Sequence, residues 1–435
     1  MRVGSSAADT VQSGRAEGLD DGLALSLSSA IGSITGLLGW IVATRLVEPI
    51  EVGEAAQLVA AFILISGAAQ LNLGVGLLRW IPAAGRFTGK LVWSGLLLIL
   101  PLGALVGLGY VYLVPAIGRT AAGDGSFGLG VLLFVLAAAG WTVFVVHDYV
   151  LVAVGRPWWA VWRNALFAAV RLSLLIVLCL NGLGAQGIVL SWVVPIVVWI
   201  GVGSVALAVL TRSISRRSRE GTLPTGRKAA AFLAPTAVAM LSNSLLYNEV
   251  TVLVTDRFGD ETGAKFFIIW QAVTVVDLSV TFFMNSLAVG VARDPLRAAE
   301  LATTARRRLM LIYLPVLAFG CVVAGPVLDL VFGPAYAEAA DVLRLLLVGL
   351  AFRLVVLHEL GVREAIGRAL AYARLQLIST IAVIVVAAVV PVGAADVTAL
   401  LPVAFGYIAV QAICAAAVLL APARRRPTDV EVVSP

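Results

Sequence analysis

The chain alternates between long apolar runs and short polar connectors. Runs bounded by Gly, Pro or charged residues predict twelve helices, each near the roughly 20 residues that a membrane-crossing helix needs. The expected spans are residues 22–46, 54–80, 91–114, 127–153, 157–181, 187–210, 230–255, 262–292, 309–332, 341–363, 370–392 and 397–421. Long strands of alternating polar and apolar residues, which build outer-membrane barrels, are missing from the sequence. The pattern predicts an all-α polytopic membrane protein.

Composition supports this class and excludes a soluble enzyme. Of the 435 residues, 60% are hydrophobic and 13% are charged, whereas charge in soluble proteins is usually near 25%. Cys179, Cys321 and Cys414 each lie within an apolar run without a second Cys or His at metal-binding spacing. We therefore expect no disulfide, no metal site and no cofactor. Residues 1–21 are polar and predict a cytoplasmic tail, not a signal peptide.

The basic residues predict the orientation of the chain. A net charge of +6 would suggest a nucleic-acid partner in a soluble protein. Here an even number of spans places both termini on one side, and a cytoplasmic location leaves 23 of the 31 Lys and Arg residues in inner segments. The outer loops hold Arg119, Arg257 and Lys265. The positive-inside pattern accounts for the basic charge, so we expect no nucleic-acid partner.

The longest connectors also predict the domain organisation. Residues 211–229 are basic, too short for a folded domain, and divide the spans into two sets of six. We expect an N-lobe at 22–210, a C-lobe at 230–421 and a second cytoplasmic tail at 422–435. The connector is interpreted as a solvated linker with at most one interfacial turn against anionic lipid head groups.

An internal repeat contains both histidines. His147 and Asp148 precede an Ala-Val-Gly-Arg segment at 153–156, and His358 and Glu359 precede Ala-Ile-Gly-Arg at 365–368, an offset of 211 to 212 residues. Both copies end the fourth span of their half, which predicts two parallel, pseudo-symmetric six-helix lobes around a central cavity. Two interpretations of the His-acid pairs remain: interfacial capping, or a titrating role in proton coupling.

A few charges lie where lipid should exclude them. Arg171, Asp277 and Arg353 fall near the middle of their spans, and Glu249 lies in the outer half of its span. A charge at that depth costs ~2.5 kcal/mol or more. Asp277 could pair structurally with one arginine, but two arginines against one acid leave positive charge over. This favours a water-filled cavity that accepts an anion, with Asp277 and Glu249 as candidates for ion coupling.

Polar residues on span 262–292 form one stripe. They recur at intervals of three or four and are Gln271, Thr274, Asp277, Thr281 and Asn285. The stripe is interpreted as cavity lining, with a helix–helix hydrogen-bond ladder as the alternative. Arg45, at the outer end of the first span, could snorkel, pair with Glu48 or face the cavity mouth.

Four segments, in order, resemble a known family. They are GLLGWIVATRLVEPIEVG (36–53), LNLGVGLLRWIP (71–82), DYVLVAVGRPWWAVWRNALFAAVRL (148–172) and VLDLVFGPAYAEAADVLRLLL (327–347). Together they resemble the polysaccharide biosynthesis, or lipid-linked oligosaccharide (O-antigen-type) flippase, family. That family belongs to the multidrug/oligosaccharidyl-lipid/polysaccharide (MOP) flippase superfamily.

The resemblance implies export without enzymatic chemistry. A polyprenyl-pyrophosphate-linked oligosaccharide would be turned from the cytoplasmic to the outer leaflet of a bacterial plasma membrane by alternating access. The implied partners are this anionic lipid-linked glycan, membrane lipids and the polysaccharide assembly machinery. By position, Arg45, Arg171 and Arg353 are the candidates for the cationic cavity residues of the family. A guanidinium also offers paired donors that match pyrophosphate oxygens.

Two rival functions follow from the same sequence. A multidrug extruder of the superfamily exchanges a cation for Na⁺ or H⁺ and generally has acidic cavity residues. The central charges, two Arg against one Asp, favour an anionic substrate instead. A membrane-embedded glycosyltransferase or polymerase would need a large outer loop or an acidic metal cluster, and no predicted outer loop exceeds roughly a dozen residues.

Overall fold

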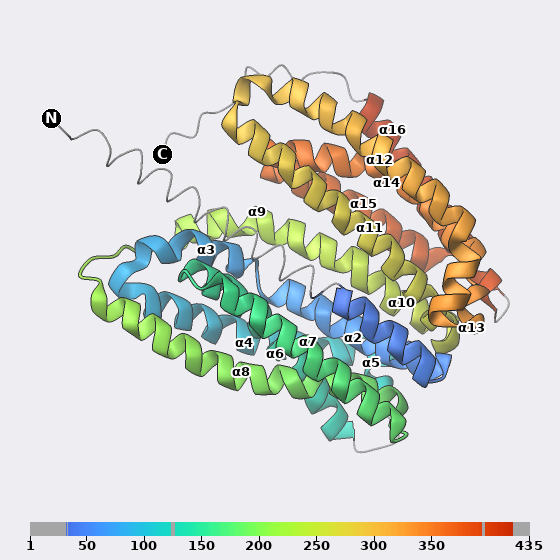
Figure 1. Ribbon diagram of the computed structural model, residues 1–435, viewed down its shortest axis with the longest axis horizontal. Helices are drawn as coiled ribbons and strands as arrows, with labels where there is room; N and C mark the ends of the chain where they lie inside the picture. Colours follow the sequence, from blue (N-terminus) through green and yellow to red (C-terminus); the bar gives the residue numbers. More distant parts are fainter. Residues whose placement is uncertain (1–31, 33, 123–126, 394–395, 421–435) are drawn as a thin grey trace. The chain divides into compact units, whose positions relative to one another are not determined.

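The computed structural model describes residues 32, 34–122, 127–393 and 396–420. The predicted tails at 1–21 and 422–435 lie outside this range. Throughout the described residues the regular structure is helical (Figure 1). Ten helical segments in this part of the chain are long and apolar enough to cross a membrane. The expected class, an all-α polytopic membrane protein, is confirmed.

The long helices overlap the predicted spans, and residues 22–31 and 33 of the first span lie outside the described range. The first half contains Ile34–Leu46, α2 (Pro49–Ala69), α3 (Leu73–Ala84), α4 (Thr88–Leu113), α5 (Pro115–Ala122), α6 (Phe127–Ala153), α7 (Pro157–Leu180) and α8 (Gly184–Arg217). The second half contains α9 (Gly226–Ser244), α10 (Val250–Phe258), α11 (Asp260–Arg293), α12 (Ala298–Val327), α13 (Pro334–Ala337), α14 (Ala340–Ala365), α15 (Ala369–Val389) and α16 (Leu401–Leu420). A helix satisfies its backbone hydrogen bonds internally, which is why apolar runs in lipid adopt it.

The chain forms two compact units. The first holds the described residues up to Leu46 together with Ile65–Ala234, and the second holds Val47–Leu64 together with the described residues from Pro235 onward. The chain passes between them three times: between Leu46 and Val47, within α2, and within α9. Residues 47–64 thus group with the second unit, although they precede most of the first in sequence. The N-lobe and C-lobe boundaries, 22–210 and 230–421, stay a prediction.

Each unit is built around one central helix. In the first unit α6 packs against α3, α4, α7 and α8. Its buried core includes Leu77 of α3, Ile99 of α4, Val146 of α6 and Leu207 of α8. In the second unit α14 packs against α11, α12, α15 and α16. The central helix is the fourth predicted span of its half in both cases, as an internal repeat requires.

The repeated Ala-x-Gly-Arg segments form the same turn in both units. Gly155 follows α6 and Gly367 follows α14, each with φ near the left-handed region at +73°. The Arg156 amide donates to Leu151 and the Arg368 amide to Arg363, both at 2.8 Å. This six-to-one bond is the Schellman helix ending, which favours glycine at the left-handed position. The repeat noticed in sequence is therefore also a repeat in backbone geometry.

Two predicted spans are interrupted. Span 54–80 is divided into α2 and α3 because Leu71 and Asn72 adopt φ of +50° and +54°, values that no α-helix can continue. Span 230–255 is divided by a π-helical segment, Leu245–Glu249. Apolar periodicity did not reveal either interruption, since both leave the surrounding hydrophobicity unchanged.

The linker prediction needs correction. α8 continues through Arg217 and α9 begins at Gly226, so only residues 218–225 are non-helical. That segment is also paired with another turn: the Thr222 amide donates to Ala83 at 2.9 Å, and the Arg86 amide donates to Glu220 at 3.1 Å. Gly85 has φ +47° and lies so close to Glu220 that a side chain would overlap the Glu220 backbone. The linker is therefore shorter than predicted and is held against the turn before α4, while most of its residues are exposed.

Candidate functional site

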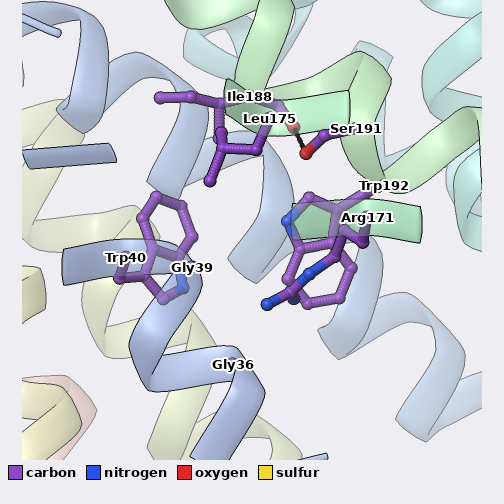
Figure 2. A pocket seen from close by; sticks show the side chains of 8 residues that line it. All are labelled: Gly36, Gly39, Trp40, Arg171, Leu175, Ile188, Ser191 and Trp192. Atoms are coloured by element: carbon purple, nitrogen blue, oxygen red, sulfur yellow. Dashed lines mark hydrogen bonds between the residues drawn. The ribbon is translucent and has the colours of Figure 1, made fainter. Parts of the chain in front are cut away.

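Arg171 of α7 is a buried cation inside the first unit. Its side chain is 5% exposed, and its Nη2 donates a hydrogen bond of 2.6 Å to the Thr35 carbonyl on helix Ile34–Leu46. The guanidinium lies 4.2 Å from the centre of the Trp192 ring on α8 (Figure 2). A cation over an indole face is attracted by the ring quadrupole. Three helices thus fix the position of this charge.

Small residues make room for the guanidinium. A Cβ on Gly39 would lie 2.6 Å from Arg171 Nη2, so only a bare backbone permits this approach. Figure 2 shows the pocket between the three helices. It is lined by Gly36, Gly39, Trp40, Arg171, Leu175, Ile188, Ser191 and Trp192. Its free space of about 10 Å³ is room for about one water molecule.

The charge of Arg171 is not neutralised by an acid within the described residues. None of the ion pairs there includes Arg171, which instead contacts the Thr35 carbonyl and the Trp192 ring. A guanidinium has five N–H donors and strongly favours an anionic acceptor when it is desolvated. The electrostatics of this position would favour an anion, but the pocket beside the guanidinium has room for about one water molecule, so a substrate contact at Arg171 stays a prediction.

Arg353 of α14 has a different environment, in the second unit. It is 1% exposed and Asp277 of α11 is 2% exposed. Nε and Nη2 of Arg353 donate to the two carboxylate oxygens of Asp277 at 3.2 and 3.3 Å. This fork-to-fork arrangement neutralises both charges. The structural pairing left open by the sequence is the arrangement that the second unit adopts.

Three further side chains complete this network. The Tyr247 hydroxyl donates to Asp277, and Arg353 donates to Ser379 at 3.1 Å and to Gln376 at 3.4 Å. Sequence reasoning did not assign Gln376 or Ser379. Polar residues at 376, 379 and 380 of α15 follow the spacing of three or four that singled out the stripe on α11, so the same signal could have found them.

The remaining candidates are distributed between the units. Arg45 lies in the first unit with Arg171, and it is exposed near the end of its helix. The second unit holds Gln271, Thr274, Asp277, Thr281, Asn285, Glu249 and Arg353.

The polar residues of the stripe on α11 differ in their contacts and in their exposure. Thr274 donates to the Trp270 carbonyl at 2.9 Å and Thr281 to the Asp277 carbonyl at 3.1 Å, so both hydroxyls bond back to their own helix. Gln271 is half-buried and Asn285 is exposed. Glu249 is half-buried at the end of the π-helical segment. Only Asp277 of the stripe joins the buried ionic network.

The first unit also contains an ion pair that sequence reasoning missed. Arg163 of α7 contacts Asp148 of α6 at 2.7 Å, and Asn164 donates to the same carboxylate at 2.7 Å. His147 is 1% exposed, and neither ring nitrogen has a hydrogen-bond partner among the described residues. The expected interfacial His-acid pair therefore does not form here, because the acid of the motif is bound by α7.

Comparison with solved structures identifies the fold. The inward-facing structure of a multidrug resistance MATE family transporter of the MOP superfamily is 17% identical, with a TM-score of 0.68 over 95% of this chain and 100% of that one. The chain has the MATE transporter fold. An outward-facing MATE family structure matches with a TM-score of 0.57 at 17% identity, over 94% of this chain and 95% of that one.

A third MATE-fold match comes from Pyrococcus furiosus. That MOP superfamily transporter has a TM-score of 0.54 and 17% identity over 94% of this chain and 93% of its own, and the reverse polarity of its binding pocket is described as suggesting a different function. No protein-family model matches the sequence, and a comparison with curated proteins finds no match. The MATE fold is thus established, whereas the resemblance to polysaccharide flippases gains no support from these comparisons.

Proposed function

We propose that this chain is a membrane transporter that works by alternating access and extrudes drug-like amphiphilic compounds. The observation that supports this most directly is the likeness of nearly the whole chain to MATE family structures in both inward-facing and outward-facing conformations. Multidrug extrusion was the alternative function in the sequence analysis, and the fold comparison favours it over lipid-linked oligosaccharide flipping. The proposal includes both termini in the cytoplasm of a bacterial plasma membrane, supported by the positive-inside pattern.

The chemistry of the first unit favours a substrate with an anionic group. Arg171 is buried, and it contacts an uncharged carbonyl and an indole ring. The acid of the second unit that could attract a cation, Asp277, is bound by Arg353. A purely cationic substrate would therefore find a repulsive charge in one unit and a neutralised acid in the other.

The buried Arg171 also favours a second candidate function, the flipping of a lipid-linked oligosaccharide. An uncompensated buried arginine also suits the pyrophosphate of a lipid-linked oligosaccharide, because phosphate oxygens accept paired guanidinium donors. If this second function is the right one, the proposed partners are the lipid-linked anionic glycan and the polysaccharide assembly machinery.

A transport assay in two arms separates the candidates. The full chain is reconstituted into proteoliposomes and tested for movement of cationic and anionic amphiphilic dyes, and, in parallel, for movement of a fluorescent polyprenyl-pyrophosphate glycan between leaflets. Proton and sodium gradients are imposed in turn, because the assay should also identify which ion drives the extruder. Dye transport driven by a gradient supports extrusion, and glycan movement without dye transport supports flipping.

Arg171→Gln is the informative variant in this assay. The exposed Arg119→Gln removes the same charge outside the pocket and serves as its control. Transport that is lost in Arg171→Gln and retained in Arg119→Gln supports a substrate contact at Arg171. If no arm shows transport with well-folded protein, the proposed function is wrong.

A further inference from the structure

A second hollow in the first unit lies at one end of its helices. It has a volume of about 730 Å³ and lies between the start of α4 and the end of α8, which is within the roughly 300 to 1,000 Å³ typical of ligand pockets. The Gly89 amide of α4 donates to the Ser215 hydroxyl of α8 at 3.1 Å, joining the two helices at the base. We call this feature the basic hollow.

Four cations line the basic hollow. They are Arg86, Lys90, Arg212 and Arg216, and all four side chains are exposed. None of the ion pairs in the described part of the chain includes them. Like charges gathered without an acid repel one another, so an arrangement of this kind is stabilised when an anion occupies it.

The linker helps to maintain this arrangement. The backbone bonds from Thr222 to Ala83 and from Arg86 to Glu220 hold residues 220–222 against the turn before α4. Arg86 therefore comes from an anchored turn and Arg212 from the rigid end of a long helix. The charges are positioned by folded backbone on both sides of the hollow.

The surroundings of the hollow identify its ligand. On α8, exposed Val205 and Val209 lie on the same helical face as Arg212. On α4, exposed Leu97 is two turns from Lys90 and also shares its face. Trp93, an amphipathic ring of the type enriched at membrane interfaces, lines the hollow as well. Lipid-facing apolar surface thus leads directly into the cations.

We propose that the basic hollow binds the phosphate head group of an anionic phospholipid. The acyl chains would follow the apolar faces of α4 and α8, and the phosphate would accept from the guanidinium and ammonium donors. The positive-inside pattern predicts that this end is cytoplasmic. The inference concerns a lipid that binds to the outside of the first unit, so it does not depend on which substrate the transporter carries.

Native mass spectrometry of the full chain in neutral detergent tests the proposal. Phosphatidylglycerol is titrated against phosphatidylcholine, and soluble glycerol phosphate and inorganic phosphate are added as competitors. The test variant is Arg86→Gln/Lys90→Gln/Arg212→Gln/Arg216→Gln. The matched control, Arg217→Gln/Arg219→Gln/Arg227→Gln/Lys228→Gln, removes the same charge from exposed residues of the adjoining linker region that do not line the hollow. Thermal unfolding in phosphatidylcholine verifies that both variants are folded.

The expected result is a preference for phosphatidylglycerol that falls at least about tenfold in the test variant and less than about threefold in the control, since each basic residue near the surface contributes appreciably to anionic lipid binding. Equal losses in the two variants would overturn the proposal, because they would indicate non-specific attraction. Displacement of the lipid by millimolar soluble phosphate would overturn it too, because the hollow would then be a site for a free anion. Binding of both lipids with equal affinity by the unmodified chain would also overturn the proposal, because the hollow would then not select an anionic head group.

Discussion

Arg171 of the first unit and Arg353 of the second are both buried in helices of membrane-spanning length, but their charges have opposite environments. In the second unit Arg353 forms a bidentate pair with Asp277. Tyr247 of the π-helical segment donates to Asp277, and Arg353 donates to Ser379 of α15. In the first unit Arg171 contacts a carbonyl and an indole face. A charge that is fully paired contributes to structure, whereas a desolvated charge without an acid partner is available to a ligand.

The comparison also separates what the repeat preserves from what it does not. The Schellman turns at Gly155 and Gly367 have the same φ and the same bonds. Arg171 lies on α7 of the first unit, whereas Arg353 lies on α14, the counterpart of α6. The repeated scaffold is therefore common to the units, and the buried charges are specific to each.

The largest effect on stability is expected from breaking the pair in the second unit. Asp277→Asn leaves Arg353 buried without an anion and should lower the free energy of unfolding by about 3 to 5 kcal/mol. Asp277→Asn/Arg353→Gln removes both charges and should recover much of that loss, which thermal unfolding in detergent and a double-mutant cycle would measure. The cycle also needs the single variant Arg353→Gln. If the loss in the double variant equals the sum of the losses in the two single variants, Asp277 and Arg353 do not interact directly.

Removing the hydroxyl from Tyr247 should have the next largest effect. Tyr247→Phe deletes a hydrogen bond to the Asp277 carboxylate and should cost about 1.5 to 3 kcal/mol, the range for bonds to charged groups. Tyr313→Phe, on the half-buried Tyr313 of α12, is the control and should change stability by about 0.5 kcal/mol or less. Unfolding midpoints that shift equally would place Tyr247 outside the network.

The repeated turns offer a smaller and matched effect. Gly155→Ala and Gly367→Ala each force a Cβ into a left-handed conformation and should each destabilise the protein by about 1 kcal/mol. Gly201→Ala, within α8 and with open space around its Cβ, should instead stabilise by up to about 1 kcal/mol. Chemical denaturation of the three variants would measure these signs, and unequal losses at 155 and 367 would show that the two turns are not equivalent.

The smallest change in stability is expected at Arg171, where the functional effect should be greatest. Arg171→Gln gives up a cation–π contact and a hydrogen bond but also removes a desolvated charge, so the net change should stay within about 1 kcal/mol. Transport should nevertheless be lost. A variant that unfolds as readily as Asp277→Asn would mean that Arg171 is a structural residue like Arg353.

Much of the fold followed from the sequence for a physical reason. In lipid, helix formation is dictated by apolar length, and α6 spans Phe127–Ala153 as predicted. The division of α2 from α3 was missed because two positive φ values at Leu71 and Asn72 leave no trace in hydrophobicity. The extension of α8 to Arg217 was missed because basic residues ended the predicted span, although a helix can continue beyond the membrane boundary.

The candidate site was predictable in depth but not in pairing. The positions of Arg171, Asp277 and Arg353 within their spans identified them as buried charges. Periodicity places a residue on a helical face, but it does not say which helix lies opposite. The Asp277–Arg353 pair depends on α11 lying beside α14. The uncharged surroundings of Arg171 depend on Gly39 and Trp192, which come from two other helices.

The ion pair of the second unit also constrains how the protein is made. Asp277 and Arg353 are 76 residues apart, and at about 5 to 20 residues per second a ribosome needs about 4 to 15 s to travel between them. Throughout that interval the acid of α11 has been synthesised, while the arginine that neutralises it has not. A nascent chain that stops before α14 therefore carries an acid that lipid rejects, and we expect it to be recognised by membrane quality-control proteases before the complete chain is.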